Sequence, residues 1–81
     1  MPTRKKMSRD MRKNLIEGLV YRSPEPMRVL DIARAMGMVR SPYLTGLIDE
    51  LVNERRLATT EVELAPDLIA RAYIAPRLGV Q

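Results

Sequence analysis

Cysteine and histidine are both absent from the 81 residues of this chain. Without cysteine the chain forms neither a disulfide nor a thiolate metal site, which is compatible with a reducing cytoplasm. Without histidine it lacks the commonest metal ligand and the usual general base of enzymes. The sequence also has no glycine-rich phosphate loop and no paired carboxylates suited to catalysis. We therefore predict a protein that is not an enzyme and that needs no metal or cofactor.

Long apolar runs are also missing from the sequence. No run approaches the roughly 20 residues that a membrane-spanning helix requires. The basic start, MPTRKK, leads into the polar run Ser8-Arg9-Asp10, where a secretory signal would carry its apolar segment. These features predict a cytoplasmic protein with no membrane partner, and no small-molecule ligand is evident.

Positive charge is concentrated at the amino end of the chain. Residues 1–13 hold six basic side chains against one acidic side chain, a net charge of +5. Residues 14–81 hold eight basic and nine acidic side chains, a net charge of −1. A basic arm is typical of a nucleic-acid-binding protein, and a solubilising tail is the alternative explanation. Charge alone leaves both explanations open.

Two apolar stripes organise the middle of the chain. Each falls at the i, i+3, i+4, i+7 spacing of one helix face: Val29, Ile32, Ala33 and Met36, then Leu44, Leu47, Ile48 and Leu51. Gly37 follows the first stripe, where a left-handed residue commonly ends a helix. Ser41 and Pro42 precede the second stripe, as N-cap and first helical residue. The pattern predicts helices over 29–36 and 42–54 joined by a tight link.

The preceding segment predicts a further helix over 9–21. Ser8 can cap its start, and the two prolines of Ser23–Pro26 end it. Its expected apolar face consists of residues at helical spacing: Met11, Leu15, Ile16, Leu19 and Val20. Helices with one apolar face each must bury that face against other elements, so we expect the three helices to pack together.

After the helices the apolar period changes to two. Residues 58–64 and 69–75 predict two strands. The turn signal Ala65-Pro66-Asp67 lies between them and predicts a hairpin with a loop of about four residues. We expect Met27 to pair briefly with this hairpin, which would make the sheet three-stranded at one point.

These elements predict a mainly α fold with a small β-hairpin, an α+β domain over residues 9–76. A flexible basic arm over 1–8 and a tail over 77–81 flank it. A chain of this length makes one domain with a modest core, so a homodimer would help its stability.

Three runs of residues carry a family resemblance: Val29-x-x-Ile32-Ala33-x-x-Met36-Gly37, Ser41-Pro42-x-Leu44-x-x-Leu47-Ile48-x-x-Leu51 and Arg56-Leu57-Ala58. Over residues 9–76 the order of helix, helix-turn-helix and hairpin resembles the winged helix-turn-helix family of small bacterial, archaeal and phage regulators. The resemblance implies a sequence-specific double-stranded DNA-binding protein, a transcriptional regulator that acts as a homodimer. It also implies that the helix over 42–54 enters the major groove.

The resemblance points to contact residues at the start of that helix: Arg40, Ser41, Tyr43, Thr45 and Gly46. Arg40 suits a guanine edge or a phosphate, and Thr45 suits a thymine methyl group or a base edge. Tyr43 can donate its hydroxyl to a phosphate, and Gly46 lets the helix approach a DNA backbone closely. The alternatives are a solvated Arg40 and a partly buried core tyrosine at position 43.

A second set of basic residues is expected to contact phosphates: Arg4, Lys5, Lys6, Arg28, Arg34 and Arg71. The first three belong to the arm, which can reach the backbone or an adjacent minor groove. Arg34 has the alternative of pairing with Asp31 or remaining hydrated. Glu50 and Glu54 are expected to form a solvated face with Arg55.

One feature favours a different function. The hairpin tip, Leu64–Ile69, is apolar and acidic, whereas wings that track DNA carry Arg, Lys and Gly there. The stretch Asp49–Asp67 holds six carboxylates against two arginines. A winged-helix protein–protein interaction module or accessory protein that uses this wing is therefore the alternative. A dimer seam made by the helix over 9–21 and the segment Arg77–Gln81 is a further hypothesis.

Overall fold

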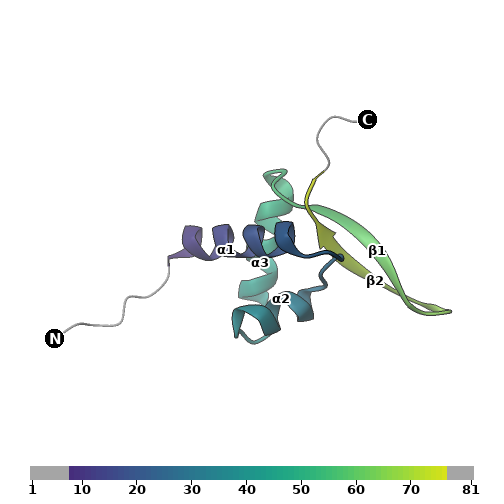
Figure 1. Cartoon of the computed structure of the whole chain (residues 1–81). Coiled ribbons are helices and arrows are strands. Elements are labelled where there is room, and N and C mark those ends of the chain that lie inside the picture. Colours follow the sequence, from purple (N-terminus) through teal and green to yellow (C-terminus); the bar gives the residue numbers. More distant parts are fainter. Residues whose placement is uncertain (1–7, 77–81) are drawn as a thin grey trace.

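The fold is described from a computed structural model of the chain, over residues 8–76. Its elements, in chain order, are α1 (Arg9–Arg22), α2 (Val29–Met36), α3 (Pro42–Asn53), β1 (Ala58–Ala65) and β2 (Leu68–Ile74). The two strands form an antiparallel hairpin that projects from the three helices (Figure 1). The predicted α+β fold is confirmed, and its arrangement is winged-helix-like. The predicted arm, apart from Ser8, and the predicted tail lie outside the described residues.

Local capping signals set the helix boundaries where the sequence predicts them. The Ser8 hydroxyl accepts a hydrogen bond from the Met11 backbone N–H at 3.1 Å, which satisfies an otherwise unpaired donor of α1. The Ser41 hydroxyl accepts one from the Leu44 N–H at 3.4 Å at the start of α3. Gly37 ends α2 at φ 67°, in the left-handed region that glycine adopts without steric cost.

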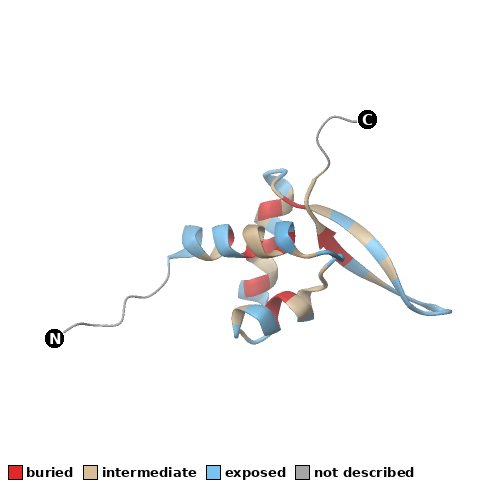
Figure 2. Ribbon diagram, in the orientation of Figure 1, coloured by how far each residue is buried: buried red, intermediate tan, exposed pale blue. Residues whose placement is uncertain are grey.

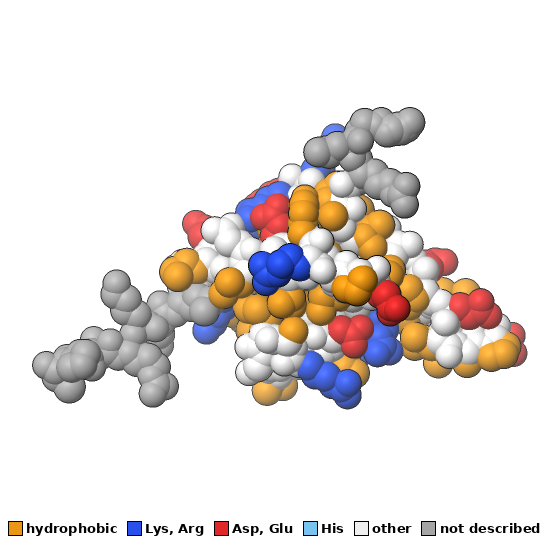
Figure 3. All heavy atoms as spheres, in the orientation of Figure 1, with side chains coloured by type: hydrophobic (Ala, Val, Ile, Leu, Met, Phe, Trp, Pro, Cys, Tyr) orange, Lys and Arg blue, Asp and Glu red, His pale blue; other side chains and the backbone are white. Residues whose placement is uncertain are grey.

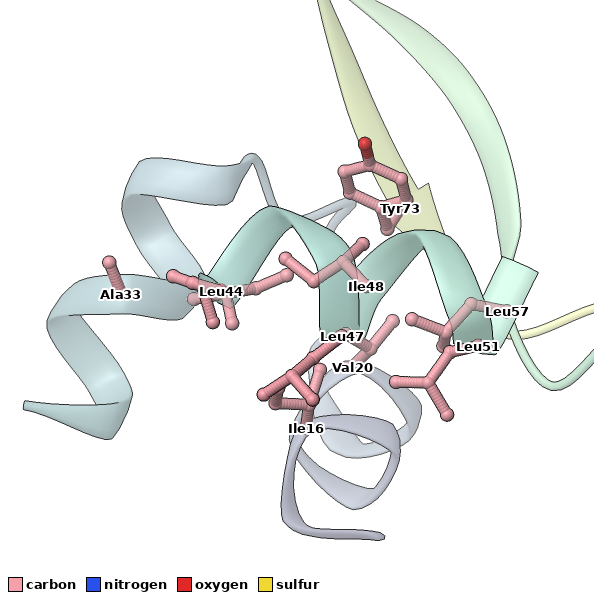
Figure 4. Close-up of a cluster of buried hydrophobic side chains, with 10 residues drawn as sticks. Ile16, Val20, Ala33, Leu44, Leu47, Ile48, Leu51, Leu57 and Tyr73 are labelled. Carbon is pink, nitrogen blue, oxygen red and sulfur yellow. The ribbon is translucent and has the colours of Figure 1, made fainter. Parts of the chain in front are cut away.

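The core is built around the apolar stripe of α3. Its four members are completely buried: Leu44, Leu47, Ile48 and Leu51. Ile16 and Val20 of α1 pack on one side of α3 and Tyr73 of β2 packs on the other (Figure 4). Burial is confined to the sides of the elements that face one another, and the far end of the hairpin is exposed (Figure 2). Within residues 8–76, no helix has both the length and the apolar character needed to cross a bilayer.

The hairpin is closed more tightly than predicted. Ala65 pairs with Leu68, so the turn contains only Pro66 and Asp67, and the predicted loop of about four residues is wrong. The register shifts between Glu63 and Ala65. This irregularity leaves one extra residue on β1 and lets the strands continue up to the turn.

The expected short pairing at Met27 is confirmed. The backbones of Met27 and Tyr73 exchange two hydrogen bonds, at 3.0 and 2.8 Å. This bridge ties the chain between α1 and α2 to the base of β2. Because the base of the hairpin is enclosed in this way, Tyr73 and its neighbour Ala72 are both buried, although they point to opposite faces.

The predicted apolar face of α1 is only partly correct. Ile16 and Val20 are buried, but Met11 and Leu15 are exposed. In their place Lys13 is turned inward and is only 5% exposed. Periodicity finds the apolar residues of a helix, but the contact with α3 covers a narrower stripe that passes through Lys13.

The α3 stripe generates a stability prediction. We expect Leu47→Ala to lower the free energy of unfolding by about 2–5 kcal/mol, because it leaves a cavity in the core. Val39, which is 81% exposed, provides a control, and Val39→Ala is expected to change stability by less than about 0.5 kcal/mol. Urea unfolding followed by circular dichroism measures both values. Equal losses in the two variants would contradict this placement of α3.

Candidate nucleic-acid interface

Ser41 and Thr45 at the start of α3 are engaged with the backbone of the helix. Ser41 caps α3, so its hydroxyl oxygen already accepts the Leu44 N–H. The Thr45 hydroxyl lies 3.3 Å from the Ser41 carbonyl oxygen and 3.1 Å from the Pro42 carbonyl oxygen. Its hydrogen is therefore donated within the helix, and its methyl group and oxygen lone pairs remain for an external partner.

Gly46 has no internal reason to lack a side chain. A Cβ atom built at this position meets no other atom of the described chain within 4 Å. Glycine inside a helix lowers its stability by about 1 kcal/mol relative to alanine. The space in front of Gly46 is open, which fits the hypothesis that this face admits the close approach of another backbone.

Tyr43 is held at the surface by arginines of α1. Its side chain is 41% exposed, and the guanidinium carbons of Arg9 and Arg12 lie 5.8 and 5.6 Å from its ring centroid. Arg12 Nη1 also donates a hydrogen bond to the Tyr43 hydroxyl oxygen at 3.2 Å. The two contacts with the ring, from Arg9 and from Arg12, are cation–π arrangements that join α1 to α3. Tyr43 is therefore not a core tyrosine, and α1 orients its ring.

Three of the predicted phosphate-contacting or base-contacting arginines line one groove. Arg28 lies at the start of α2, Arg40 in the link before α3 and Arg71 on β2. The groove has a volume of about 270 Å³, and Val29, Leu30 and Tyr73 also line it. Arginines that are up to 43 positions apart, as Arg71 and Arg28 are, thus line one groove.

Arg28 is already paired with a carboxylate of α2. Its Nε and Nη2 atoms lie 3.2 Å from the two carboxylate oxygens of Asp31, and its backbone N–H donates to the same carboxylate at 3.0 Å. These contacts lower the pKa of Asp31 and raise the pKa of Arg28. Asp31 thus pairs with Arg28 rather than with Arg34, which was the alternative expected from the sequence.

Three other arginines of the interface lack such a partner. Within residues 8–76, no ion pair joins Arg34, Arg40 or Arg71 to a carboxylate. All three side chains are exposed. An exposed guanidinium without an internal partner keeps its full set of hydrogen-bond donors for an anion. The predicted arm residues Arg4, Lys5 and Lys6 lie outside the described residues.

The opposite end of α3 has a different electrostatic environment. Lys13 Nζ lies 3.1 Å from a carboxylate oxygen of Glu50 and 2.7 Å from one of Glu54, and Arg9 also pairs with Glu50. The hydrogen bond from Lys13 is the main cause that lowers the pKa of Glu54. The prediction that Glu50 and Glu54 associate with Arg55 is therefore wrong, although both side chains keep part of their surface in solvent. Arg9 and Lys13, which contribute to the basic amino end, thus form ion pairs with α3.

Arg56 completes this cluster. Its Nη2 atom lies 2.7 Å from Glu17 and 2.6 Å from the Asn14 side-chain oxygen, and its Nη1 atom lies 3.2 Å from Glu54. The hydrogen bond with Glu17 is the main cause that raises the pKa of Arg56. The carboxylates on the side of α3 that faces α1 are therefore neutralised by neighbouring cations.

Comparisons of the chain with protein-family models, curated proteins and solved structures found no match. What is established is the topology, three helices followed by a two-stranded antiparallel hairpin. Support for the candidate interface therefore comes from its own geometry.

Sequence reasoning missed the link between α1 and α3. Arg9 and Lys13 are four residues apart on α1, and Glu50 and Glu54 are four residues apart on α3. Because i and i+4 lie on the same side of a helix, two helices expected to pack could have been matched by these charges. Arg12, which has the contact with Tyr43, carries no such signal in the sequence.

The Arg28–Asp31 pair makes stability depend on pH. The folded chain holds the pKa of Asp31 below its ordinary value near 3.8, so the pair stabilises the fold above that pH. This contribution is lost as the pH falls through the lowered pKa. We expect Asp31→Asn to lose less stability than the parent between about pH 5 and about pH 2, measured by urea unfolding.

The matched control for this measurement is Asp49→Asn. Asp49 is exposed on α3 and belongs to no ion pair of the described chain. Its replacement is expected to leave the acid dependence of the parent intact. Identical acid profiles for the parent and Asp31→Asn would show that the pair contributes nothing.

Proposed function

We propose that this protein is a sequence-specific double-stranded DNA-binding protein that acts as a transcriptional regulator and is not an enzyme. The start of α3 would enter the major groove, as the recognition helix of the winged helix-turn-helix family does. The observation that supports this most directly is the sorting of charge along α3. Glu50 and Glu54 are neutralised by cations of α1, whereas Arg40, in the link before α3, and Arg71, which lines the same groove, form no ion pair within residues 8–76.

We propose separate roles for the residues of the candidate interface. Arg40 is the candidate for a guanine edge, and Thr45 offers its methyl group to a thymine. Arg34 and Arg71 are candidates for phosphate contacts, which set affinity rather than sequence preference. Arg28 would take part only as a partly neutralised member of its pair with Asp31. Ser41 would act indirectly, by capping α3.

The arm residues Arg4, Lys5 and Lys6 would add contacts to the backbone or to a minor groove. Their contribution rests on charge and position in the sequence. It would appear mainly as a steeper dependence of affinity on salt concentration.

Selection of bound sequences from a random DNA pool tests the proposal directly. An enriched motif, with affinity that falls as salt rises, is the expected result. Mobility-shift titration at two salt concentrations then measures the affinity for the selected duplex. Failure to bind any duplex, even at low salt, would eliminate the proposal.

Replacement of Arg40 is expected to weaken binding to the selected duplex by roughly 10- to 100-fold, the worth of one bidentate base contact of about 1–3 kcal/mol. If Arg40 reads a base, Arg40→Gln also relaxes the preference at one position. Arg55→Gln makes the same charge change at the far end of α3 and serves as the control. Equal losses in the two variants would indicate a general charge effect instead of a contact.

Gly46→Ala separates stability from binding. Because the added methyl group meets no protein atom, we expect the free energy of unfolding to rise by about 1 kcal/mol. We expect binding to the selected duplex to weaken, because the methyl group would occupy the space into which the DNA backbone comes. A variant that is more stable and binds DNA like the parent would contradict the close-approach hypothesis.

A homodimer is part of the proposal. Met11 and Leu15 are exposed one turn apart on α1 and offer an apolar contact between two copies. The other half of the hypothetical seam, Arg77–Gln81, lies outside the described residues. Sedimentation equilibrium measures the mass in solution, and a monomer at high micromolar concentration would exclude the dimer.

The hairpin supports a second candidate function, protein–protein interaction. Leu68 and Ile69 are 54% and 58% exposed near its tip, among the carboxylates of Glu61, Glu63 and Asp67. Hydrophobic and acidic side chains gather on the projecting hairpin in the space-filling view (Figure 3). This surface suits a protein better than a polyanion.

The double variant Leu68→Ser, Ile69→Ser should then keep the DNA affinity of the parent, and a large loss would indicate that the tip contacts DNA.

A further inference from the structure

Arg12 differs from the other basic residues at the start of α1. Arg9 and Lys13 are bound to carboxylates of α3, whereas no ion pair within residues 8–76 includes Arg12. Within residues 8–76 its side chain donates one hydrogen bond, to the Tyr43 hydroxyl oxygen at 3.2 Å. A guanidinium has five N–H donors, so four remain for another partner.

Tyr43 is also left with a donor. Its hydroxyl oxygen accepts the hydrogen bond from Arg12, which leaves the hydroxyl hydrogen to be donated elsewhere. The ring is fixed in place because the guanidinium groups of Arg9 and Arg12 lie within 6 Å of its centroid. Arg9 is in turn held by Glu50. Donors that are ordered before binding lose less entropy when a ligand arrives.

The two donors stand on the side of α3 that faces α1. Figure 4 shows α1 on one side of α3 and β2 on the other. Arg12 belongs to α1, whereas Arg71 belongs to β2 and lines the groove with Arg40. The two elements that flank α3 therefore each carry an arginine, Arg12 and Arg71, that forms no ion pair within residues 8–76. A major groove about 12 Å wide is bounded by two phosphate backbones, so a helix inside it meets one backbone on each side.

We propose that Arg12 and Tyr43 form a phosphodiester-binding site on the α1 side of α3. Arg12 would supply the charge and two parallel N–H donors, a geometry that matches two phosphate oxygens. Tyr43 would orient the guanidinium and donate its hydroxyl to the same phosphate. The ligand is a backbone phosphate of duplex DNA, so this inference rests on the proposed function. It makes α1 a part of the interface.

The test uses the full chain and the duplex recovered by the random-pool selection. Fluorescence anisotropy gives the dissociation constant of each variant over a range of salt concentrations. Arg12→Gln is expected to weaken binding about tenfold at about 0.1 M salt and to reduce the salt slope by about 0.9, the value for one lost phosphate contact. Tyr43→Phe is expected to weaken binding several-fold with the slope unchanged, because no charge is removed.

Two further variants separate a contact from a diffuse field. Arg12→Lys keeps the charge and is expected to keep the salt slope of the parent, but to bind more weakly because an ammonium lacks the paired donors. Arg22→Gln removes an equal charge from the exposed last turn of the same helix and is the matched control. It is expected to change neither the slope nor the affinity.

Each outcome decides the inference. If the parent binds and Arg12→Gln binds with the same affinity and slope, the site is refuted while the proposed function stands. A loss of slope in Arg22→Gln equal to that in Arg12→Gln also refutes it. If the parent binds no duplex, the proposed function fails and this inference fails with it. Circular dichroism checks folding, and if Arg12→Gln does not fold, the affinities of Arg12→Lys and Tyr43→Phe decide.

Discussion

Burial of one face of α3 is the constraint on which the rest of this structure depends. Its apolar stripe, which runs from Leu44 to Leu51, is completely buried between α1 and β2. Because a helix has only one rotation that buries such a stripe, the outer positions follow from it. Tyr43, Thr45 and Gly46 are thereby presented away from the central stripe. Any function of this surface requires the core to hold α3 in that rotation.

Electrostatics adds a second constraint that acts along α3. Lys13 is almost completely buried, and a buried ammonium requires a charged or hydrogen-bonded partner. Glu50 and Glu54 supply two carboxylates, so the negative charge of α3 is balanced where it meets α1. Arg40 and Arg71, which line one groove with Arg28, have no such partner within residues 8–76. The ion pairs with α1 thus neutralise Glu50 and Glu54, whereas Arg40, just before α3, keeps its charge unpaired.

Features that depend on residues close together along the chain could be predicted from the sequence. The bounds of α2 agree with the prediction because Gly37 ends the apolar stripe and supplies the left-handed cap. The start of α3 agrees because Ser41 and Pro42 are strong local signals. The hairpin loop could not be predicted, since the register shift after Glu63 depends on strand pairing. Exposure of Met11 likewise depends on how α1 crosses α3, which periodicity does not contain.

The sequence by itself determined the order of the elements, the helix boundaries and the α+β class, because caps and apolar periodicity act over a few residues. It also named the cationic candidates. Only the tertiary structure decided which of these cations form ion pairs or hydrogen bonds within the fold. Lys13 and Glu54 are 41 positions apart, and Arg12 and Tyr43 are 31 apart. Such contacts arise from the packing of whole helices. The i, i+4 charge spacing on each helix is compatible with the Lys13–Glu54 pair, but which helix faces meet is decided only when the helices pack.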